Sequence, residues 1–140
     1  MIYDFIKLVK SNVGINEFFT IDSLKGLLES TEIYKYGFED VFYESILIST
    51  NEIKTVKFQN KTIMIYTEQQ NIKQNDVIVN LLKKQKGYIV DDLIDLLYKE
   101  YGININKSKI LEICYESNLY YNKELEKIYI SKEQWYKEVY

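Results

Sequence analysis

The side chains that carry most enzyme chemistry are nearly absent from this chain of 140 residues, which contains no histidine and a single cysteine, Cys114. Without histidine there is no imidazole to act as a general base, to activate a nucleophile or to bind a metal. A lone thiol forms no internal disulfide and, without partners, no zinc site. We therefore expect Cys114 to be a small buried hydrophobic residue and not a reactive thiol.

The acidic pairs do not form a catalytic arrangement either. Asp91-Asp92 and Glu39-Asp40 are each adjacent in sequence, and neighbouring residues on a helix do not converge on one substrate. The chain has only five glycines and no glycine-rich loop that could hold a phosphate group. We predict that the protein is not an enzyme and that it binds no metal, cofactor or small-molecule substrate.

The overall composition is typical of a globular protein, with 46% hydrophobic and 28% charged residues and a net charge of −3. Alanine, proline and arginine are absent, while lysine, isoleucine, asparagine and tyrosine are abundant, a bias expected of an AT-rich genome. No run of about 18 apolar residues and no signal-peptide pattern occurs. With the lone thiol, these features predict a cytoplasmic protein that makes no membrane contact.

One sequence pattern occurs twice. The tetrapeptide Phe-Tyr-Glu-Ser at residues 42–45 recurs as Cys-Tyr-Glu-Ser at residues 114–117. Each copy follows a short β-like stretch and a helical pattern, and each precedes a hairpin pattern. This alignment pairs Phe42 with Cys114, and we expect both side chains to be buried at equivalent positions.

The first copy of the pattern predicts three helices and a hairpin. Residues 2–11 have helical spacing, and residues 17–21 form a short extended piece. A second helix carries Leu24, Leu27 and Leu28, and a third helix follows Gly37. We expect the apolar stripe of the third helix to contain Phe38, Val41, Phe42 and Ser45. The alternating residues 55–58 and 62–65 predict two strands joined by a turn at residues 59–61.

The second copy repeats this order. An apolar stripe predicts a helix around residues 77–82, a strand at residues 88–90, and a second helix that ends at Gly102. Asn106 is a candidate cap of a third helix, and residues 119–121 and 127–130 are expected to pair as a hairpin. Ser131 and Gln134 have the spacing of a capping box and predict an additional C-terminal helix. The predicted core face of the third helix contains Ile110, Ile113, Cys114 and Ser117.

A helix, a short strand, two helices and a hairpin, given twice, resemble two tandem winged-helix units. The resemblance implies an α+β fold in which each unit has three helices and a β-hairpin wing. We place the units at residues 1–67 and 76–140, with a polar linker at residues 68–75. Winged-helix proteins most often insert the third helix into the major groove of DNA and touch phosphate with the wing. The resemblance therefore implies a binding module of a transcription or DNA-handling system.

The second unit is the better candidate for DNA contact. Asn106, Lys107, Ser108 and Lys109 open its third helix, and a helix N-terminus with two lysines and a hydroxyl suits phosphate. Asn106 could equally serve only as the helix cap. Residues 71–140 carry eleven lysines and eleven acidic residues, so this half does not repel DNA. A further basic cluster, whose lysines also suit the end of a helix, consists of Lys83, Lys84 and Lys86.

The wing of the first unit carries three lysines with two possible roles. Lys54, Lys57 and Lys61 could contact phosphate, or they could simply protect the edge of the hairpin from pairing with another chain. Residues 1–70 carry seven lysines against ten acidic residues, so the first unit should repel DNA at long range.

Two regions favour a protein partner. Glu39, Asp40 and Glu44 give the third helix of the first unit an acidic face, which we expect to be exposed because unpaired carboxylates are costly to bury. Aromatic residues that include Tyr136 and Tyr140 crowd the C-terminal end; they could stack on unpaired bases, form a protein interface or close the core. The alternative function is thus a protein-docking module with no direct contact to nucleic acid.

Overall fold

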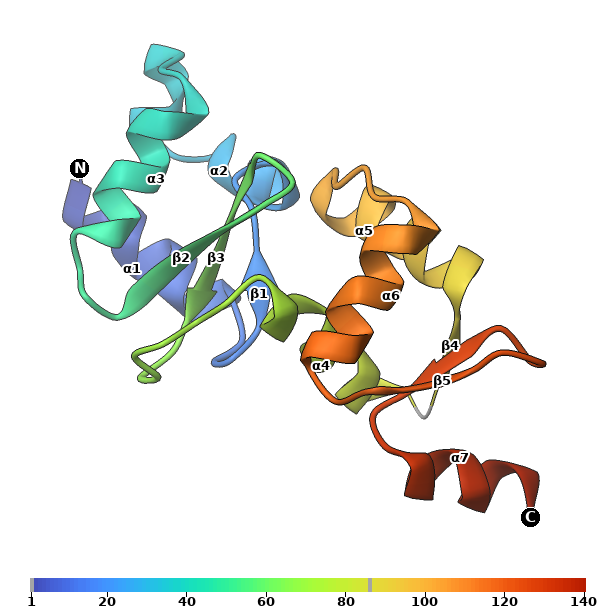
Figure 1. The fold of residues 1–140 in the computed structure, drawn as a ribbon. Coiled ribbons are helices and arrows are strands. Elements are labelled where there is room, and N and C mark those ends of the chain that lie inside the picture. Colours follow the sequence, from blue (N-terminus) through green and yellow to red (C-terminus); the bar gives the residue numbers. More distant parts are fainter. Residues whose placement is uncertain (1, 86) are drawn as a thin grey trace. The chain divides into compact units, whose positions relative to one another are not determined.

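The computed structural model describes residues 2–85 and 87–140. The chain divides into two compact units, Met1–Ile72 and Lys73–Tyr140, and each is described by itself (Figure 1). Both units combine helices with a small antiparallel sheet, which confirms the α+β class. No helix in the described part of the chain is long and apolar enough to cross a membrane. Lys86, predicted to join Lys83 and Lys84 in a basic cluster, lies outside the described residues.

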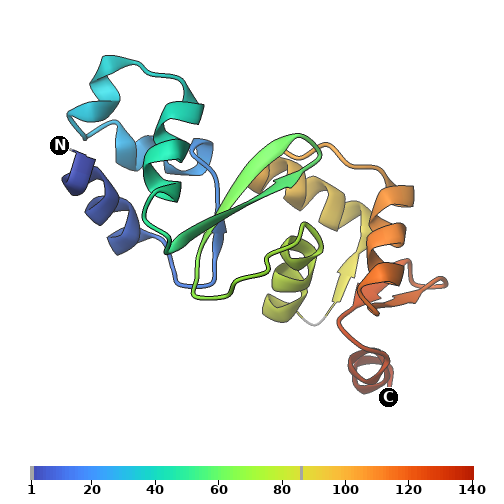
Figure 2. The same ribbon diagram turned by 60° about the vertical axis from the view of Figure 1, so that its left-hand side comes forward.

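The first unit contains helices and 3₁₀ turns that cover a three-stranded sheet. Its elements are α1 (Ile2–Asn12), β1 (Phe18–Phe19), η1 (Asp22–Leu24), α2 (Lys25–Leu28), η2 (Ile33–Tyr36), α3 (Asp40–Ile48), β2 (Ile53–Phe58) and β3 (Lys61–Tyr66). The strand order is β1-β3-β2, with both pairings antiparallel. Figure 2 shows α1, α2 and α3 gathered on one side of the β2–β3 hairpin.

The hairpin turn of the first unit consists of two residues. Gln59 and Asn60 have φ angles of 49° and 67°, and two consecutive left-handed residues form the tight turn that matches the twist of paired strands. Lys61, expected in the turn, is instead the first residue of β3 and pairs with Phe58. The predicted turn is therefore one residue too long.

The core of the first unit lies between its helices and the sheet. Helix α1 contributes Phe5 and Val9, helix α3 contributes Tyr43 and Leu47, and each is at most 1% exposed. The Tyr43 ring contacts the Phe5 ring at 5.7 Å between centroids. These contacts fix the rotation of α3 about its axis, because burying Tyr43 and Leu47 turns the opposite side of the helix to solvent.

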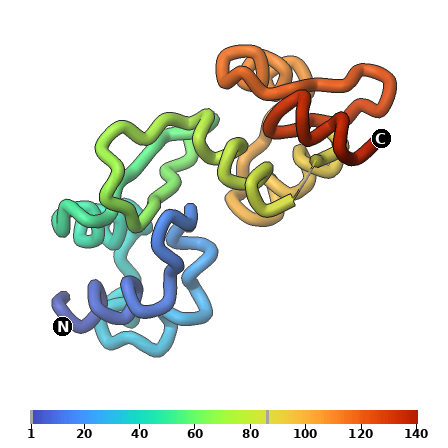
Figure 3. The backbone as a smooth tube through the Cα atoms, turned by 90° about the horizontal axis from the view of Figure 1, so that it is seen from below, coloured from blue at the N-terminus to red at the C-terminus, as the bar shows by residue number. Residues whose placement is uncertain are grey.

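The second unit repeats the order of the first and adds one helix. Its elements are α4 (Asn75–Lys84), β4 (Gly87–Ile89), α5 (Val90–Tyr101), α6 (Lys107–Glu116), β5 (Tyr120–Asn122), β6 (Lys127–Tyr129) and α7 (Lys132–Val139). The strand order β4-β6-β5 is the same as in the first unit, where the strand after the first helix pairs with the last strand. Helix α7 lies against β5 and β6 (Figures 1 and 3).

Local signals in the second unit match the observed helix ends. Helix α5 ends at Gly102 in the left-handed conformation, with φ 68°. The side chains of Asn106 and Ser131 cap α6 and α7 by accepting hydrogen bonds from the backbone N–H groups of Lys109 and Gln134. The additional C-terminal helix is confirmed, and so are the two residues predicted to begin α6 and α7.

The two third helices are aligned by the turns that follow them. Asn51 and Asn118 both adopt left-handed φ angles, 63° and 58°, in the turns that follow Ile48 and Glu116, the last residues of these helices. Tyr43 and Ile110 each lie eight residues before these asparagines, and Leu47 and Cys114 each lie four residues before them. All four side chains are buried.

The alignment drawn from the repeated tetrapeptide is therefore wrong. Cys114 is buried as predicted, but Phe42 is 38% exposed and Ser45 is exposed too. The tetrapeptide misleads because aromatic residues occupy adjacent positions, Phe42 and Tyr43, which face different sides of a helix. The core takes Tyr43, and it leaves Phe38, Val41 and Phe42 at the surface.

Candidate functional site

The surface of the first unit carries a cluster of exposed apolar side chains at the start of α3. We call this cluster the aromatic patch; it consists of Tyr36, Phe38, Val41 and Phe42, which are 62%, 46%, 69% and 38% exposed. The Tyr36 and Phe38 rings lie 5.9 Å apart, and the Phe38 and Phe42 rings lie 4.2 Å apart between centroids. Three of the four residues were predicted to be in the core stripe, and the structure places them at the surface instead.

The backbone between η2 and α3 positions this patch. Gly37 adopts a left-handed conformation with φ 71°, which glycine adopts at no steric cost. The turn at Gly37 brings Tyr36 and Phe38, on either side of it, next to the first turn of α3. Glu39 then begins the helix in an extended conformation, without a side-chain cap.

The buried Tyr43 ring packs against two rings of the patch. The ring is fully buried and lies 5.6 Å from the Phe42 ring in an edge-to-face arrangement and 6.4 Å from the Phe38 ring. The Tyr43 hydroxyl donates toward the backbone carbonyls of Ile33 and Tyr34, at 3.4 Å each. The exposed aromatic rings therefore rest on a fixed part of the core, which lowers the entropy cost of holding them in place for a partner.

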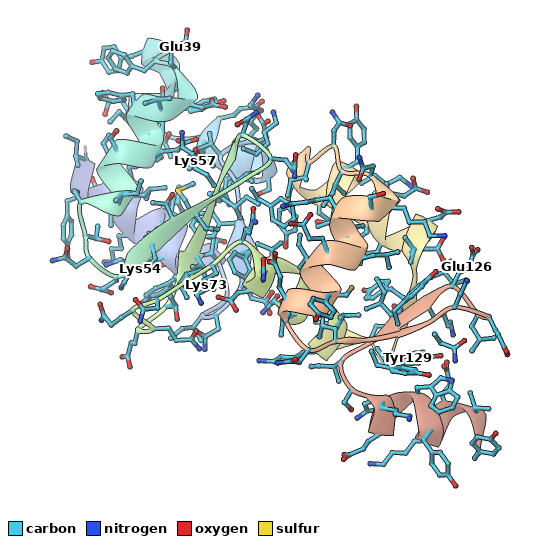
Figure 4. The ribbon with its side chains drawn as sticks, viewed as in Figure 1. Glu39, Lys54, Lys57, Lys73, Glu126 and Tyr129 are labelled. Atoms are coloured by element: carbon cyan, nitrogen blue, oxygen red, sulfur yellow. The ribbon has the colours of Figure 1, made fainter. Side chains whose placement is uncertain are left out.

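Three carboxylates lie in the first turns of α3 or at its N-cap, beside the patch. Glu39 is exposed at the start of α3, as predicted (Figure 4), whereas Asp40 and Glu44, also predicted to be exposed, are half-buried. Burial and the neighbouring Asp40 charge raise the pKa of Glu44, against the opposing effect of Lys57. In the described part of the chain none of the three carboxylates forms an ion pair. The start of α3 therefore carries acidic groups next to the aromatic patch.

The candidate DNA-contacting residues of the second unit lie together at the start of α6. Asn106, Lys107 and Ser108 are exposed, and Lys109 is half-buried. The Asn106 side-chain oxygen accepts a hydrogen bond of 2.8 Å from the Lys109 backbone N–H. Of the two roles left open for Asn106, the structure shows the helix cap, which occupies its side-chain oxygen.

Both lysines of this group have carboxylate partners. Lys107 Nζ lies 3.2 Å from Glu126 Oε1, and Lys109 Nζ lies 3.6 Å from Glu112 Oε1. Figure 4 shows Glu126 at the β5–β6 turn. The hydrogen bond and the charge of Glu126 raise the pKa of Lys107. A phosphate group would have to compete with these carboxylates for the two ammonium groups, so the helix start attracts a polyanion only weakly.

The three lysines predicted to lie on a wing are in the β2–β3 hairpin and have different surroundings. Lys54 Nζ donates to the backbone carbonyls of Asn51 and Thr67, at 2.6 Å and 3.2 Å. It thereby ties together the two ends of the hairpin, a role that sequence reasoning missed. Lys57 and Lys61 are exposed, and Figure 4 shows Lys57 further along β2 from Lys54.

The aromatic residues at the C-terminal end divide into two groups. The Trp135 ring packs on the Tyr120 ring at 5.2 Å and closes the surface over the sheet. Tyr136 and Tyr140, predicted as partner contacts, stack on each other at 4.9 Å and are 59% and 81% exposed. Trp135 therefore fits the role of closing the core, and the exposed Tyr136 and Tyr140 fit the role of a protein interface.

Helix α7 is attached to β6 through Glu138. This carboxylate accepts a hydrogen bond from the hydroxyl of the buried Tyr129 and forms an ion pair of 3.0 Å with Lys127. Burial and the Glu138 contact raise the pKa of Tyr129 to about 12. The Tyr129 ring also lies against Gly87, where an added Cβ would come within 2.7 Å of a ring carbon. Gly87 is therefore required for the ring to fit under α7.

The described residues offer little for metal or thiol chemistry. They contain no group of three histidine, cysteine, aspartate or glutamate side chains placed to hold a metal ion. Cys114 is 2% exposed, and burial raises the pKa of its thiol to about 12. At neutral pH the thiol is therefore protonated and enclosed, which makes it a poor nucleophile.

Comparisons of the chain with known protein families, with curated proteins and with solved structures found no match.

Proposed function

We propose that this chain is a non-catalytic protein-docking module built from two tandem winged-helix units. The winged-helix assignment is supported by the order of elements, which both units share, and by the common strand order in which the first strand pairs with the last. The step from such a fold to a function is an analogy, so the choice of partner rests on the surfaces.

The aromatic patch is the observation that carries this proposal. Apolar side chains scattered singly on a surface are ordinary, but a contiguous exposed group is typical of an interaction site. Tyrosine and phenylalanine are enriched in protein interfaces, where they supply contact area at low entropy cost. Glu39, Asp40 and Glu44 favour a protein over a nucleic acid as the partner, because three carboxylates on the same helix repel phosphate.

Duplex DNA bound by the second unit is our second proposal. It is favoured by the exposed first turn of α6, where Lys107, Ser108 and free backbone N–H groups could meet phosphate. The ion pairs with Glu126 and Glu112 weigh against it. In this second proposal the chain would belong to a transcription or DNA-handling system, with the first unit still binding a protein.

The test uses the full chain purified from its native host, with a charge placed in the patch. Val41→Glu alters the most exposed patch residue, 69% exposed, and Ile15→Glu is a matched control at a loop residue that is 60% exposed. Docking through the patch predicts a stoichiometric protein that co-purifies with the wild type and with Ile15→Glu but is lost from Val41→Glu. The same proteins on all three baits would contradict the proposal.

A further inference from the structure

We propose that the occupant of the aromatic patch is a cationic segment of a partner protein, with apolar side chains flanked by lysine or arginine. The inference rests on the proposed docking function and names the chemistry of the partner. The apolar side chains would pack on Tyr36, Phe38, Val41 and Phe42. The flanking cations would face Glu39, Asp40 and Glu44.

The sign of the charge comes from the residues that surround the patch. Between residues 32 and 45 the chain carries four acidic residues, Glu32, Glu39, Asp40 and Glu44, against Lys35 alone. From neighbouring elements, the charges of Lys25 and Lys57 act on Asp40 and Glu44, but Lys25 is ion-paired with Asp22, and within the described residues neither lysine forms an ion pair with these carboxylates. Asp40 and Glu44 are half-buried and lie close enough for the Asp40 charge to raise the pKa of Glu44. A cation placed near this pair stabilises both carboxylates, whereas an anion or an uncharged apolar surface adds to the cost of their partial burial.

The same residues disfavour the other occupants of an apolar surface. A second copy of the chain related by a twofold axis would place the patch against itself and bring two sets of Glu39, Asp40 and Glu44 into one interface. An anionic membrane surface and duplex DNA would both meet these carboxylates with like charge. A cationic protein segment satisfies the apolar and the acidic parts of the surface together.

The two parts of the surface should contribute differently to binding. Phe38 and Phe42 form the tightly packed centre, with rings 4.2 Å apart over the buried Tyr43, and central aromatic anchors dominate interface energetics. Glu39 is exposed, and such rim charges mainly set the association rate and its salt dependence. Removing an anchor should weaken binding at every salt concentration, whereas removing the acids should matter most at low salt.

The experiment is a selection of random 16-residue peptides on the purified full chain, followed by affinity measurements on the enriched peptides. We expect the enriched peptides to combine apolar residues with a net positive charge. Phe38→Ala should weaken their binding by about 30-fold or more. The double change Glu39→Gln and Glu44→Gln should weaken binding roughly tenfold at about 50 mM salt and much less at about 500 mM. Ile15→Ala is the control and should leave binding unchanged.

The outcomes separate this inference from the docking function beneath it. Enriched peptides that are neutral or acidic, but lose binding with Val41→Glu, would overturn the cationic partner and leave docking at the patch in place. Peptides that bind Val41→Glu as well as wild type, or no enrichment at all, would overturn both. A mass that doubles with concentration and returns to monomer with Val41→Glu would identify a second copy as the occupant, and patch-dependent binding to vesicles of neutral lipid would identify a membrane. Circular dichroism of each variant checks that it is folded.

Discussion

Helices α3 and α6 occupy the same place in the two units, each directly before the hairpin, yet they present different surfaces. Helix α3 buries Tyr43 and Leu47 and exposes an apolar patch beside unpaired carboxylates. Helix α6 buries Ile110, Ile113 and Cys114 and exposes a capped first turn whose lysines are paired with Glu126 and Glu112.

This difference shows that a repeated fold does not repeat its function. Two core positions of the helices correspond, Tyr43 with Ile110 and Leu47 with Cys114, because each helix must cover the same kind of sheet. The outward positions are free of that requirement. The lysines of α6 form ion pairs with Glu126 and Glu112, whereas within the described residues the carboxylates of α3 form none. The helix whose outward charges form no ion pair within the described residues is the better candidate for an external partner.

The largest expected effect separates the two tyrosines of the repeated tetrapeptide. Tyr43 is fully buried and Tyr115 is 88% exposed. Tyr43→Ala should lower the free energy of unfolding by about 3–5 kcal/mol through the cavity it leaves, whereas Tyr115→Ala should change it by less than about 0.5 kcal/mol. Urea denaturation followed by far-UV circular dichroism measures both. Equal effects would mean that the core register assigned to α3 and α6 is wrong.

A smaller effect should appear in the second unit at alkaline pH. Burial raises the pKa of the Cys114 thiol from 9.0 to about 12, so the folded protein keeps a proton that the unfolded chain loses above about pH 9. Stability contributed by the neutral thiol is present below pH 9 and is lost as the pH rises toward 12. Between pH 8 and about 10.5 this amounts to ~2 kcal/mol.

The fluorescence of Trp135, the only tryptophan in the chain, reports unfolding of the second unit in this test. Cys114→Ala should remove the part of the stability loss at alkaline pH that comes from the thiol. The part that comes from Tyr129, whose pKa is also raised to about 12, should remain. An unchanged pH dependence in Cys114→Ala would show that the thiol is accessible to solvent in the folded protein.

The two helix starts should differ by about 1 kcal/mol. Asn106 caps α6 with a side-chain hydrogen bond, whereas Glu39 at the same position of α3 makes none. Asn106→Ala should therefore cost about 1 kcal/mol of stability, and Glu39→Ala should cost only a few tenths of that. Denaturant midpoints of the two variants give the comparison. A larger loss for Glu39→Ala would assign that carboxylate a structural role and remove it from the docking surface.

The smallest expected effect concerns DNA. If the second unit does not read DNA, the full chain should bind mixed duplex at about 50 mM salt no better than about 10⁻⁴ M. Changing Lys107 and Lys109 to Glu should then alter nothing measurable. Tighter binding by the wild type, weakened for all sequences by this double change and with a salt slope reduced by about 2, would establish the DNA proposal instead.

Much of the fold follows from local sequence signals. Gly102, Asn106 and Ser131 mark helix ends in the sequence, and the structure shows each of them in that place. The buried face of α6 was predictable because Ile110, Ile113 and Cys114 have the i, i+3, i+4 spacing of one helix face.

The functional surface was less accessible to sequence reasoning. Three adjacent residues, Val41, Phe42 and Tyr43, are all apolar, so periodicity alone could not decide which of them the core would take. Tertiary packing on Phe5 makes that choice. The partner of Lys107 was also hidden, because Glu126 is 19 residues away and meets it only after the hairpin folds. A sequence shows which groups are charged, but not which of them remain without a partner.

Photo-crosslinking from the two third helices in living host cells tests the central claim most directly. A photoreactive residue is placed at Val41 on α3 and, in a separate full-length chain, at Ser108 on α6. We predict a protein adduct of discrete mass from Val41, removed by protease and untouched by nuclease, and no nucleic-acid adduct from Ser108. A nuclease-sensitive adduct from Ser108 together with no protein adduct from Val41 would contradict the account.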